Sequence, residues 1–318
     1  MKKKKRIADL RIIKATEAFF NRISLPGFQG LSVGYVMAFF RRAITKGIIP
    51  HRAAAMTYRV FISLIPLLMT VFAGISFLGP NVKTTLLDFI QSMVPTYVWP
   101  AIENMINGIV NKHNGTLLSF SLLFSVFTVF NSMNVSINIL NTTFFNTGKR
   151  TLLKQLRVIG MILLIWGGII LLSVGVFIAA EAYVYRVHHY VIQSPKLLAT
   201  GIHVIKWLLL FFLVYLFIST FYYFAPAKHK HFKFFSVGST LATIAMVLVL
   251  AAMNIFFSNF SNYNALYGSL GAIFAILLWL YWNHMFLLIG YDLNVSIATA
   301  KRSALRTTST EVSSSNPQ

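Results

Sequence analysis

Six long apolar stretches dominate the pattern of hydrophobic and polar positions along the chain. Each is close to the roughly 20 residues that a helix needs to cross a bilayer. Unbroken apolar runs of this length favour helices over barrel strands, because a helix satisfies its backbone hydrogen bonds within the span. We therefore predict an all-α, polytopic membrane protein with transmembrane helices at residues 55–79, 117–138, 158–180, 204–224, 235–257 and 268–291.

The composition agrees with a membrane chain and excludes several kinds of chemistry. Hydrophobic residues make up 57% of the 318 residues and charged residues only 11%, too few to cover a soluble globule. Cysteine is absent, so disulfides, thiolate metal sites and cysteine nucleophiles are excluded. The seven acidic residues are scattered along the chain, which leaves no paired catalytic carboxylates. We predict that the protein is not an enzyme and needs no cofactor or metal.

The positive charge is distributed unevenly between the two sides of the predicted membrane. Most of the 28 Lys and Arg residues fall on the side that holds both termini. By the positive-inside rule, both termini are expected in the cytoplasm. The net charge of +21 is then mainly a signal of topology, and we expect no nucleic-acid partner.

Three domains follow from this pattern. Residues 1–50 form a basic, amphipathic cytoplasmic segment, with two helical stretches separated by PGFQG at 26–30. Such helices suit the headgroup layer, where each basic residue contributes about 1 kcal/mol against anionic lipid. Residues 51–300 form the six-helix transmembrane domain, with a short helix expected near 102–110 in the first outer loop. The Ser- and Thr-rich tail at 301–318 is expected to be disordered and cytoplasmic.

Four asparagines occur within NSMNVSINILN at 131–141, in the second predicted span. Asn131, Asn134, Asn138 and Asn141 lie within an arc of roughly 80° on one helix face. Two interpretations remain open. The amides could bond to neighbouring helices, at about 0.6 kcal/mol per contact, or they could line a hydrated path for a solute. We expect this stripe to face the sixth span.

Other polar residues near the spans are also candidates for the solute path or for contacts inside the bundle. The sixth span contains Asn283 and His284, and a neutral His284 bonded to a neighbouring carbonyl is the structural alternative. Arg59 lies near the start of the first span, where it can snorkel, and Asp292 lies at the inner end of the sixth. No acid lies at mid-membrane, so ion-coupled transport is not demanded.

Small residues and one proline predict close packing and a kink. Gly268 with Ala272, and Gly271 with Ala275, have the small-xxx-small spacing that lets membrane helices approach closely. Pro66 in the first span removes one helical hydrogen bond and is expected to bend the helix.

Several stretches resemble the BrkB/YihY-like membrane proteins. They are HRAAAMTYRVFISLIPLLMT at 51–70, the LN and basic loop at 140–157, YYFAP at 222–226 and YGSLGAIFAILLWLYWNHMFLLIGYDLN at 267–294. The resemblance implies a six-span inner (plasma) membrane protein, often described as a virulence factor or transporter, with some members once labelled ribonuclease BN. The family-like residues are Ser63, Pro66, Asn141, Pro226, Tyr267, Gly268, Gly271, Trp279, Gly290, Asp292 and Asn294.

The chain departs from this family pattern at four positions. The family more usually has alanine and glutamate where Tyr291 and Asp292 stand, and small or apolar residues near Asn283 and His284. Three functions remain in contention. The leading hypothesis is a transporter or binder of an unidentified solute. The alternative is a membrane scaffold or envelope-integrity factor that binds anionic lipid or a partner protein. A ribonuclease is disfavoured because metal-binding acids are missing. A homo-oligomer is left open.

Overall fold

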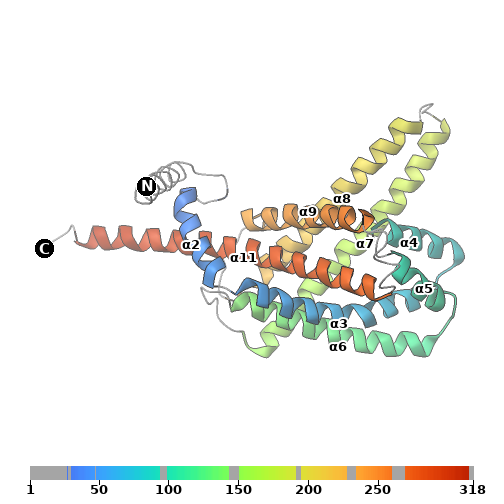
Figure 1. Cartoon of the computed structure of the whole chain (residues 1–318), viewed down its shortest axis with the longest axis horizontal. Helices are drawn as coiled ribbons and strands as arrows, with labels where there is room; N and C mark the ends of the chain where they lie inside the picture. Colours follow the sequence, from blue (N-terminus) through green and yellow to red (C-terminus); the bar gives the residue numbers. More distant parts are fainter. Residues whose placement is uncertain are drawn as a thin grey trace, which may run out of the picture.

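The computed structural model describes residues 27, 30–46, 48–93, 99–142, 150–190, 195–227, 234–259 and 269–314, and within these it contains helices and no strand (Figure 1). The helices are α2 (Val33–Lys46), α3 (Ile49–Ile75), α4 (Pro80–Met93), α5 (Trp99–Val110), α6 (Gly115–Asn141), α7 (Leu152–Tyr190), α8 (Pro195–Phe224), α9 (Val237–Asn259) and α11 (Ser269–Ser314).

Six of these helices are long and apolar enough to cross a membrane, which confirms the predicted fold class. The qualifying segments are Ile49–Ile75, Gly115–Asn141, Leu152–Val176, Trp207–Phe224, Val237–Phe256 and Ile273–Leu305. Each overlaps one predicted span, although several extend further than predicted because the helices continue past the apolar core. The cytoplasmic placement of the termini stays a prediction.

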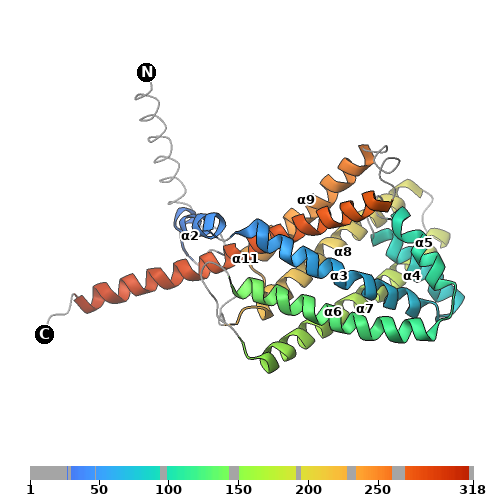
Figure 2. The ribbon, with the colours of Figure 1, turned by 60° about the horizontal axis from the view of Figure 1, so that its bottom comes forward.

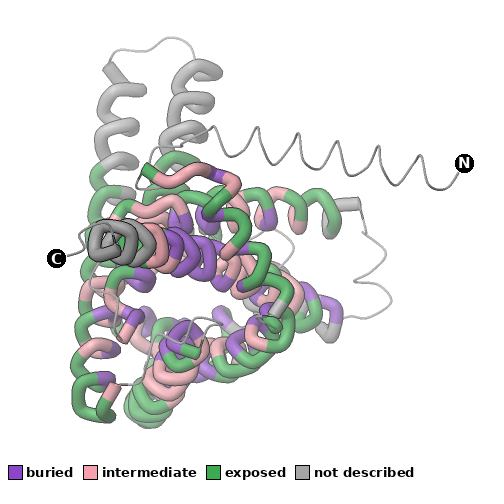
Figure 3. Tube along the Cα trace, turned by 90° about the vertical axis from the view of Figure 1, so that its left-hand side faces the viewer, coloured by how far each residue is buried: buried purple, intermediate pink, exposed green. Residues whose placement is uncertain are grey.

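The six long helices are arranged around a common axis. α6 packs on α3, α3 on α11, α11 on α9, α9 on α8, and α8 on α7, while a smaller contact between α7 and α6 closes the ring. Figure 1 shows α3, α6, α9 and α11 running in similar directions, with α7 and α8 inclined to them, and Figure 2 shows that α9 and α11 diverge from α3 and α6 toward one end. Figure 3, which looks along the long axis, shows the helices surrounding that axis.

The main apolar core lies at one end of this ring. Its buried side chains come from the first turns of α3, α7 and α9, the last turns of α6 and α8, and the middle of α11. Elsewhere the spans carry large exposed apolar side chains, for example Leu123 (75% exposed) on α6 and Leu164 (78%) on α7. In a bilayer such side chains face lipid, so tight packing between many helices is concentrated at the core end.

Local sequence explains where two of these helices begin. α6 starts after Asn114, whose side-chain oxygen accepts a hydrogen bond from the Leu117 N–H and so caps the helix. α3 starts with Pro50 in its first turn, where a missing N–H costs nothing. Ile48, with φ 49°, is left-handed and separates α2 from α3.

The loop between the first two spans and the tail contain more helix than predicted. The expected helix near 102–110 is confirmed as α5, where Ile106 and Val110 are buried beside Phe72 and Ile75 of α3, and α4 precedes it. The prediction of a disordered tail is wrong for residues 301–314, because α11 continues to Ser314. A helix that has already formed in the membrane extends at little cost, since each further residue adds one hydrogen bond without a new nucleus.

Candidate functional site

The asparagine stripe of α6 makes contacts with α7 and with the end of α8. Gln155 of α7 donates one side-chain hydrogen bond to Asn134 Oδ1 at 2.7 Å and another to Asn138 Oδ1 at 2.9 Å. Asn141 donates to the Ala225 carbonyl at 3.2 Å. Three of the four amides therefore make polar contacts with neighbouring segments, and of these Asn141 is buried, Asn134 half-buried and Asn138 exposed. Asn131 is half-buried, and its role in a solute path stays a prediction.

The expectation that the stripe faces the sixth span is wrong. α6 packs mainly on α3, and it does so through the opposite side of the helix. Ser121, Ser125, Ser132 and Ser136 are all buried and lie roughly 150° from the asparagines. Their small side chains allow close approach, and Thr70 of α3 donates to Ser125 Oγ at 3.3 Å. The paired i, i+4 serines were the signal in the sequence for this interface, which was not predicted.

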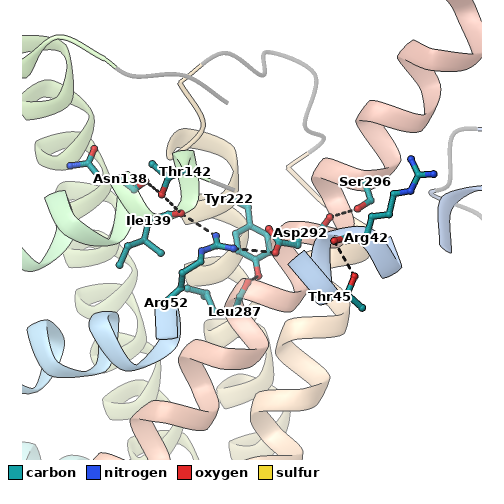
Figure 4. Close-up of polar contacts among 10 residues, drawn as sticks. All are labelled: Arg42, Thr45, Arg52, Asn138, Ile139, Thr142, Tyr222, Leu287, Asp292 and Ser296. Atoms are coloured by element: carbon teal, nitrogen blue, oxygen red, sulfur yellow. Dashed lines mark hydrogen bonds and ion pairs between the residues drawn. The ribbon is translucent and has the colours of Figure 1, made fainter. Parts of the chain in front are cut away.

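A buried ion pair joins three helices at the core end of the ring. Arg52 of α3 donates to Asp292 Oδ2 of α11 at 3.3 Å and to the Ile139 carbonyl of α6 at 3.0 Å (Figure 4). The side chains are 13% and 1% exposed, respectively. Within the described part of the chain, Asp292 Oδ1 has no hydrogen-bond partner. Asp292 was among the predicted site residues, but the predicted basic residue was Arg59. Arg59 is exposed, and Arg52 holds the central position.

The end of α8 is capped by side chains from two other helical segments. Asn141 accepts a hydrogen bond from the Ala227 N–H at 2.9 Å. Arg150, just before α7, donates to the carbonyls of Phe224 (2.9 Å), Ala225 (3.2 Å) and Pro226. Partial burial lowers the pKa of Arg150 below its usual value, but an arginine stays charged at neutral pH. The carbonyls at the negative end of the helix dipole are thus held by a cation.

The start of α9 is held from α11 in a similar way. Asn294 Oδ1 accepts a hydrogen bond from the Gly238 N–H at 2.8 Å, and Asn294 Nδ2 donates to Ser236 Oγ at 2.8 Å. The two helices touch at Gly238 and Gly290. A Cβ placed on either glycine would overlap the backbone oxygen of the other. Glycine is required here because the backbones pack directly on each other.

Tyr222 links α8 to the same region of α11. Its hydroxyl donates to the Leu287 carbonyl, and its ring packs edge-on against Tyr291 at 5.7 Å between centroids. We call the set formed by Arg52, Asn141, Arg150, Tyr222, Asp292 and Asn294 the polar junction. It ties α3, α6, α8, α9 and α11 together at one end of the ring.

Comparison with known proteins shows how far the family resemblance extends along the chain. A sequence model of the family described as virulence factor BrkB matches residues 40–314. The chain belongs to this family. No curated protein and no solved structure is significantly similar to it. In this BrkB family chain, four of the family-like residues, Asn141, Gly290, Asp292 and Asn294, lie in or beside the polar junction.

The polar residues of the sixth span in this BrkB family chain form separate contacts. His284 Nδ1 lies 3.1 Å from the Thr57 hydroxyl of α3. The same hydroxyl donates to the Ala53 carbonyl of its own helix at 2.8 Å. Asn283 donates to the Trp279 carbonyl of its own helix at 2.7 Å. Neither residue is part of the polar junction.

The predicted packing residues are only partly described. Gly271 and Ala275 are buried in α11, the side chain of Ala272 is not described, and Gly268 lies outside the described residues. Pro66 is buried inside α3, and its carbonyl accepts a hydrogen bond from Thr70 at 2.8 Å. Among the described residues, no group of three His, Asp or Glu could hold a metal ion.

Replacing Asn141 with alanine is expected to destabilise the protein by about 1–3 kcal/mol. The substitution leaves the partly buried Ala227 N–H without its acceptor, while the Ala225 carbonyl keeps Arg150 as a donor. Thermal unfolding of the detergent-purified protein measures the loss. Asn107→Ala, at an exposed position of α5, is the control and should stay within about 0.5 kcal/mol of wild type. Equal effects of the two substitutions would contradict the capping role.

Proposed function

We propose that this BrkB family chain is an inner-membrane transporter of an unidentified small solute, and that the polar junction closes the cytoplasmic end of its route. The observation that carries the proposal is the buried Arg52–Asp292 pair at one end of a ring of six membrane-spanning helices. A route along the ring axis would be closed where many helices are tied together. The proposal involves no catalytic step.

Energetics support a role for this ion pair beyond stability. Removing two charges from water costs several kcal/mol per ion, and their attraction repays this only with good geometry and further hydrogen bonds. Apolar residues of similar size often stabilise such a site as well or better. Arg52 also donates a hydrogen bond to the Ile139 carbonyl of α6. One carboxylate oxygen of Asp292, however, has no hydrogen-bond partner in the described part of the chain. We infer that the pair opens and closes as the transporter changes conformation.

The absence of cysteine allows a direct test, because the natural chain is already a background for single-cysteine labelling. A thiol reacts with a maleimide as the thiolate, which forms in water and not in lipid. Asn131→Cys and Asn134→Cys place thiols on the half-buried amide face of α6. In membrane vesicles we expect a membrane-impermeant maleimide to label both positions. Asp292→Asn should increase labelling from the cytoplasmic side, because it weakens the pair with Arg52.

Two further variants are the negative and positive controls for the labelling. Leu123→Cys, at an exposed apolar position of α6, should remain unlabelled because it faces lipid. Lys112→Cys, in the exposed turn before α6, should be labelled from the outer side. If neither Asn131→Cys nor Asn134→Cys reacts from either side while Lys112→Cys does, the amide face is dry and a route along it is ruled out.

A scaffold that binds anionic lipid is the second candidate function. The observation that favours it is α2, a basic helix that packs against α11 next to Asp292. A scaffold needs no hydrated route, so the cysteine experiment separates the two candidates. The lipid contact itself can be tested independently of transport.

A further inference from the structure

α2 lies beside the part of α11 that leaves the bundle. Val36 and Phe40 of α2 are buried against Leu293, Ile297 and Ala300 of α11. α11 has 46 residues, so it is about 69 Å long, far more than the roughly 30 Å of a hydrocarbon core. Counting about 20 residues from Ile273 places the membrane boundary near residue 292. The contact with α2 therefore begins at the membrane surface.

The orientation of α2 fits a helix that rests on that surface. Figures 1 and 2 show α2 crossing α11 at a steep angle where α11 emerges from the other helices. Because the spans run along the bundle axis, a helix that crosses them lies near the plane of the membrane. α2 continues into α3 within two residues, so the start of the first span holds it at this level.

The surface of α2 that does not pack on α11 carries basic residues, with exposed apolar residues along one side. Arg41 and Arg42 are exposed, and Figure 4 shows the Arg42 side chain extending away from Asp292. Within the described residues, neither guanidinium forms an ion pair, and α2 itself contains no acidic residue. Met37 (46% exposed) and Ile44 (40%) lie on one flank, between the buried face and Arg41. This combination is typical of helices that lie at the headgroup boundary.

We propose that α2 is a binding surface for anionic phospholipid headgroups of the same bilayer, with Arg41 and Arg42 holding the phosphates and Met37 and Ile44 contacting the acyl chains. An arginine fork pairs with two phosphate oxygens, which favours phosphate over a diffuse charge. An acidic protein partner would use the charge but would leave the apolar flank without a role. The inference does not depend on solute movement, so transport could fail its test while this proposal stands.

The experiment uses the full chain reconstituted in vesicles of phosphatidylcholine with and without phosphatidylglycerol. Ile44→Cys, the only cysteine in the chain, carries a fluorophore. A trace of brominated lipid, either anionic or zwitterionic, then quenches the fluorophore when it lies nearby. We expect stronger quenching by the brominated anionic lipid. Each basic residue near the surface gives about a five-fold preference, so Arg41→Gln with Arg42→Gln should reduce the preference about 25-fold.

Matched variants decide whether the effect belongs to α2. Lys154→Gln with Arg157→Gln removes two exposed charges from α7, also on the predicted cytoplasmic side, and should leave the preference unchanged. Arg41→Lys with Arg42→Lys keeps the charge but loses the fork, so its preference should lie between those of the wild type and the glutamine variant, and a retained preference shows that α2 is still folded. Equal loss in the α2 and α7 double variants, or no preference for anionic lipid in the wild type, would overturn the proposal.

Discussion

Gly290→Ala is expected to destabilise the folded protein by about 3 kcal/mol or more. The added Cβ would overlap the Gly238 carbonyl oxygen and lie 2.8 Å from the Tyr222 hydroxyl and 2.9 Å from Ala242 Cβ. Backbone cannot move aside as the end of a flexible side chain can, so α9 and α11 must separate. Thermal unfolding and size-exclusion chromatography of the purified protein measure the loss.

Gly168→Ala in α7 is the control for this substitution. A Cβ at Gly168 meets nothing within 4 Å, and alanine has the higher helix propensity by about 1 kcal/mol. The control should therefore be neutral or slightly stabilising. If Gly290→Ala behaves like Gly168→Ala, the close crossing of α9 and α11 is wrong.

Asp292→Ala is expected to cost about 3–5 kcal/mol, because it leaves the Arg52 guanidinium buried without its counter-ion. Arg52→Met should cost a similar amount by leaving the carboxylate alone. The double variant Arg52→Met with Asp292→Leu removes both charges and should recover most of the loss. A double-mutant cycle on thermal unfolding measures the coupling, for which we expect at least about 2 kcal/mol.

The double variant also separates stability from function. If the pair only stabilises the bundle, the double variant should be stable and unchanged in the labelling of cysteines on α6. If the pair opens and closes the route, the double variant should be stable but altered in that labelling. Additive losses in the two single variants would mean that Arg52 and Asp292 do not interact, and the polar junction would lose its central contact.

The spans could be predicted because membrane insertion depends on local properties. An apolar run of sufficient length forms a helix whatever its neighbours are, since its backbone has no other way to satisfy its hydrogen bonds. The same reasoning fails at helix ends, where water can replace those bonds. Residues 301–314 were predicted as disordered from a Ser- and Thr-rich composition but form the last part of α11.

Within the candidate site, the sequence indicated which residues are unusual but not which residues they contact. Asp292 was selected as an acid at a span end, yet its partner Arg52 was counted only as one of many basic residues before the first span. The two are separated by 240 positions, and nothing local connects them. Asn134 and Asn138 were correctly placed on one face with Asn141, but the sequence gave no reason to choose Gln155 of α7 as their donor.

The sequence by itself determined the class of this protein: six apolar helices, a basic amphipathic segment before them, and membership of a membrane family that its last span already indicated. Each of these properties depends on the average polarity of the side chains over one helical turn or one span. That average is set by residues that lie close together in the sequence. Only the tertiary structure decided that Gly238 meets Gly290, that serines rather than asparagines of α6 face α3, and that Arg52 pairs with Asp292. Such contacts depend on the rotation and crossing of whole helices, and in lipid these are set by the fit between surfaces, because lipid is as apolar as a helix and gives no hydrophobic drive to pair one face with another.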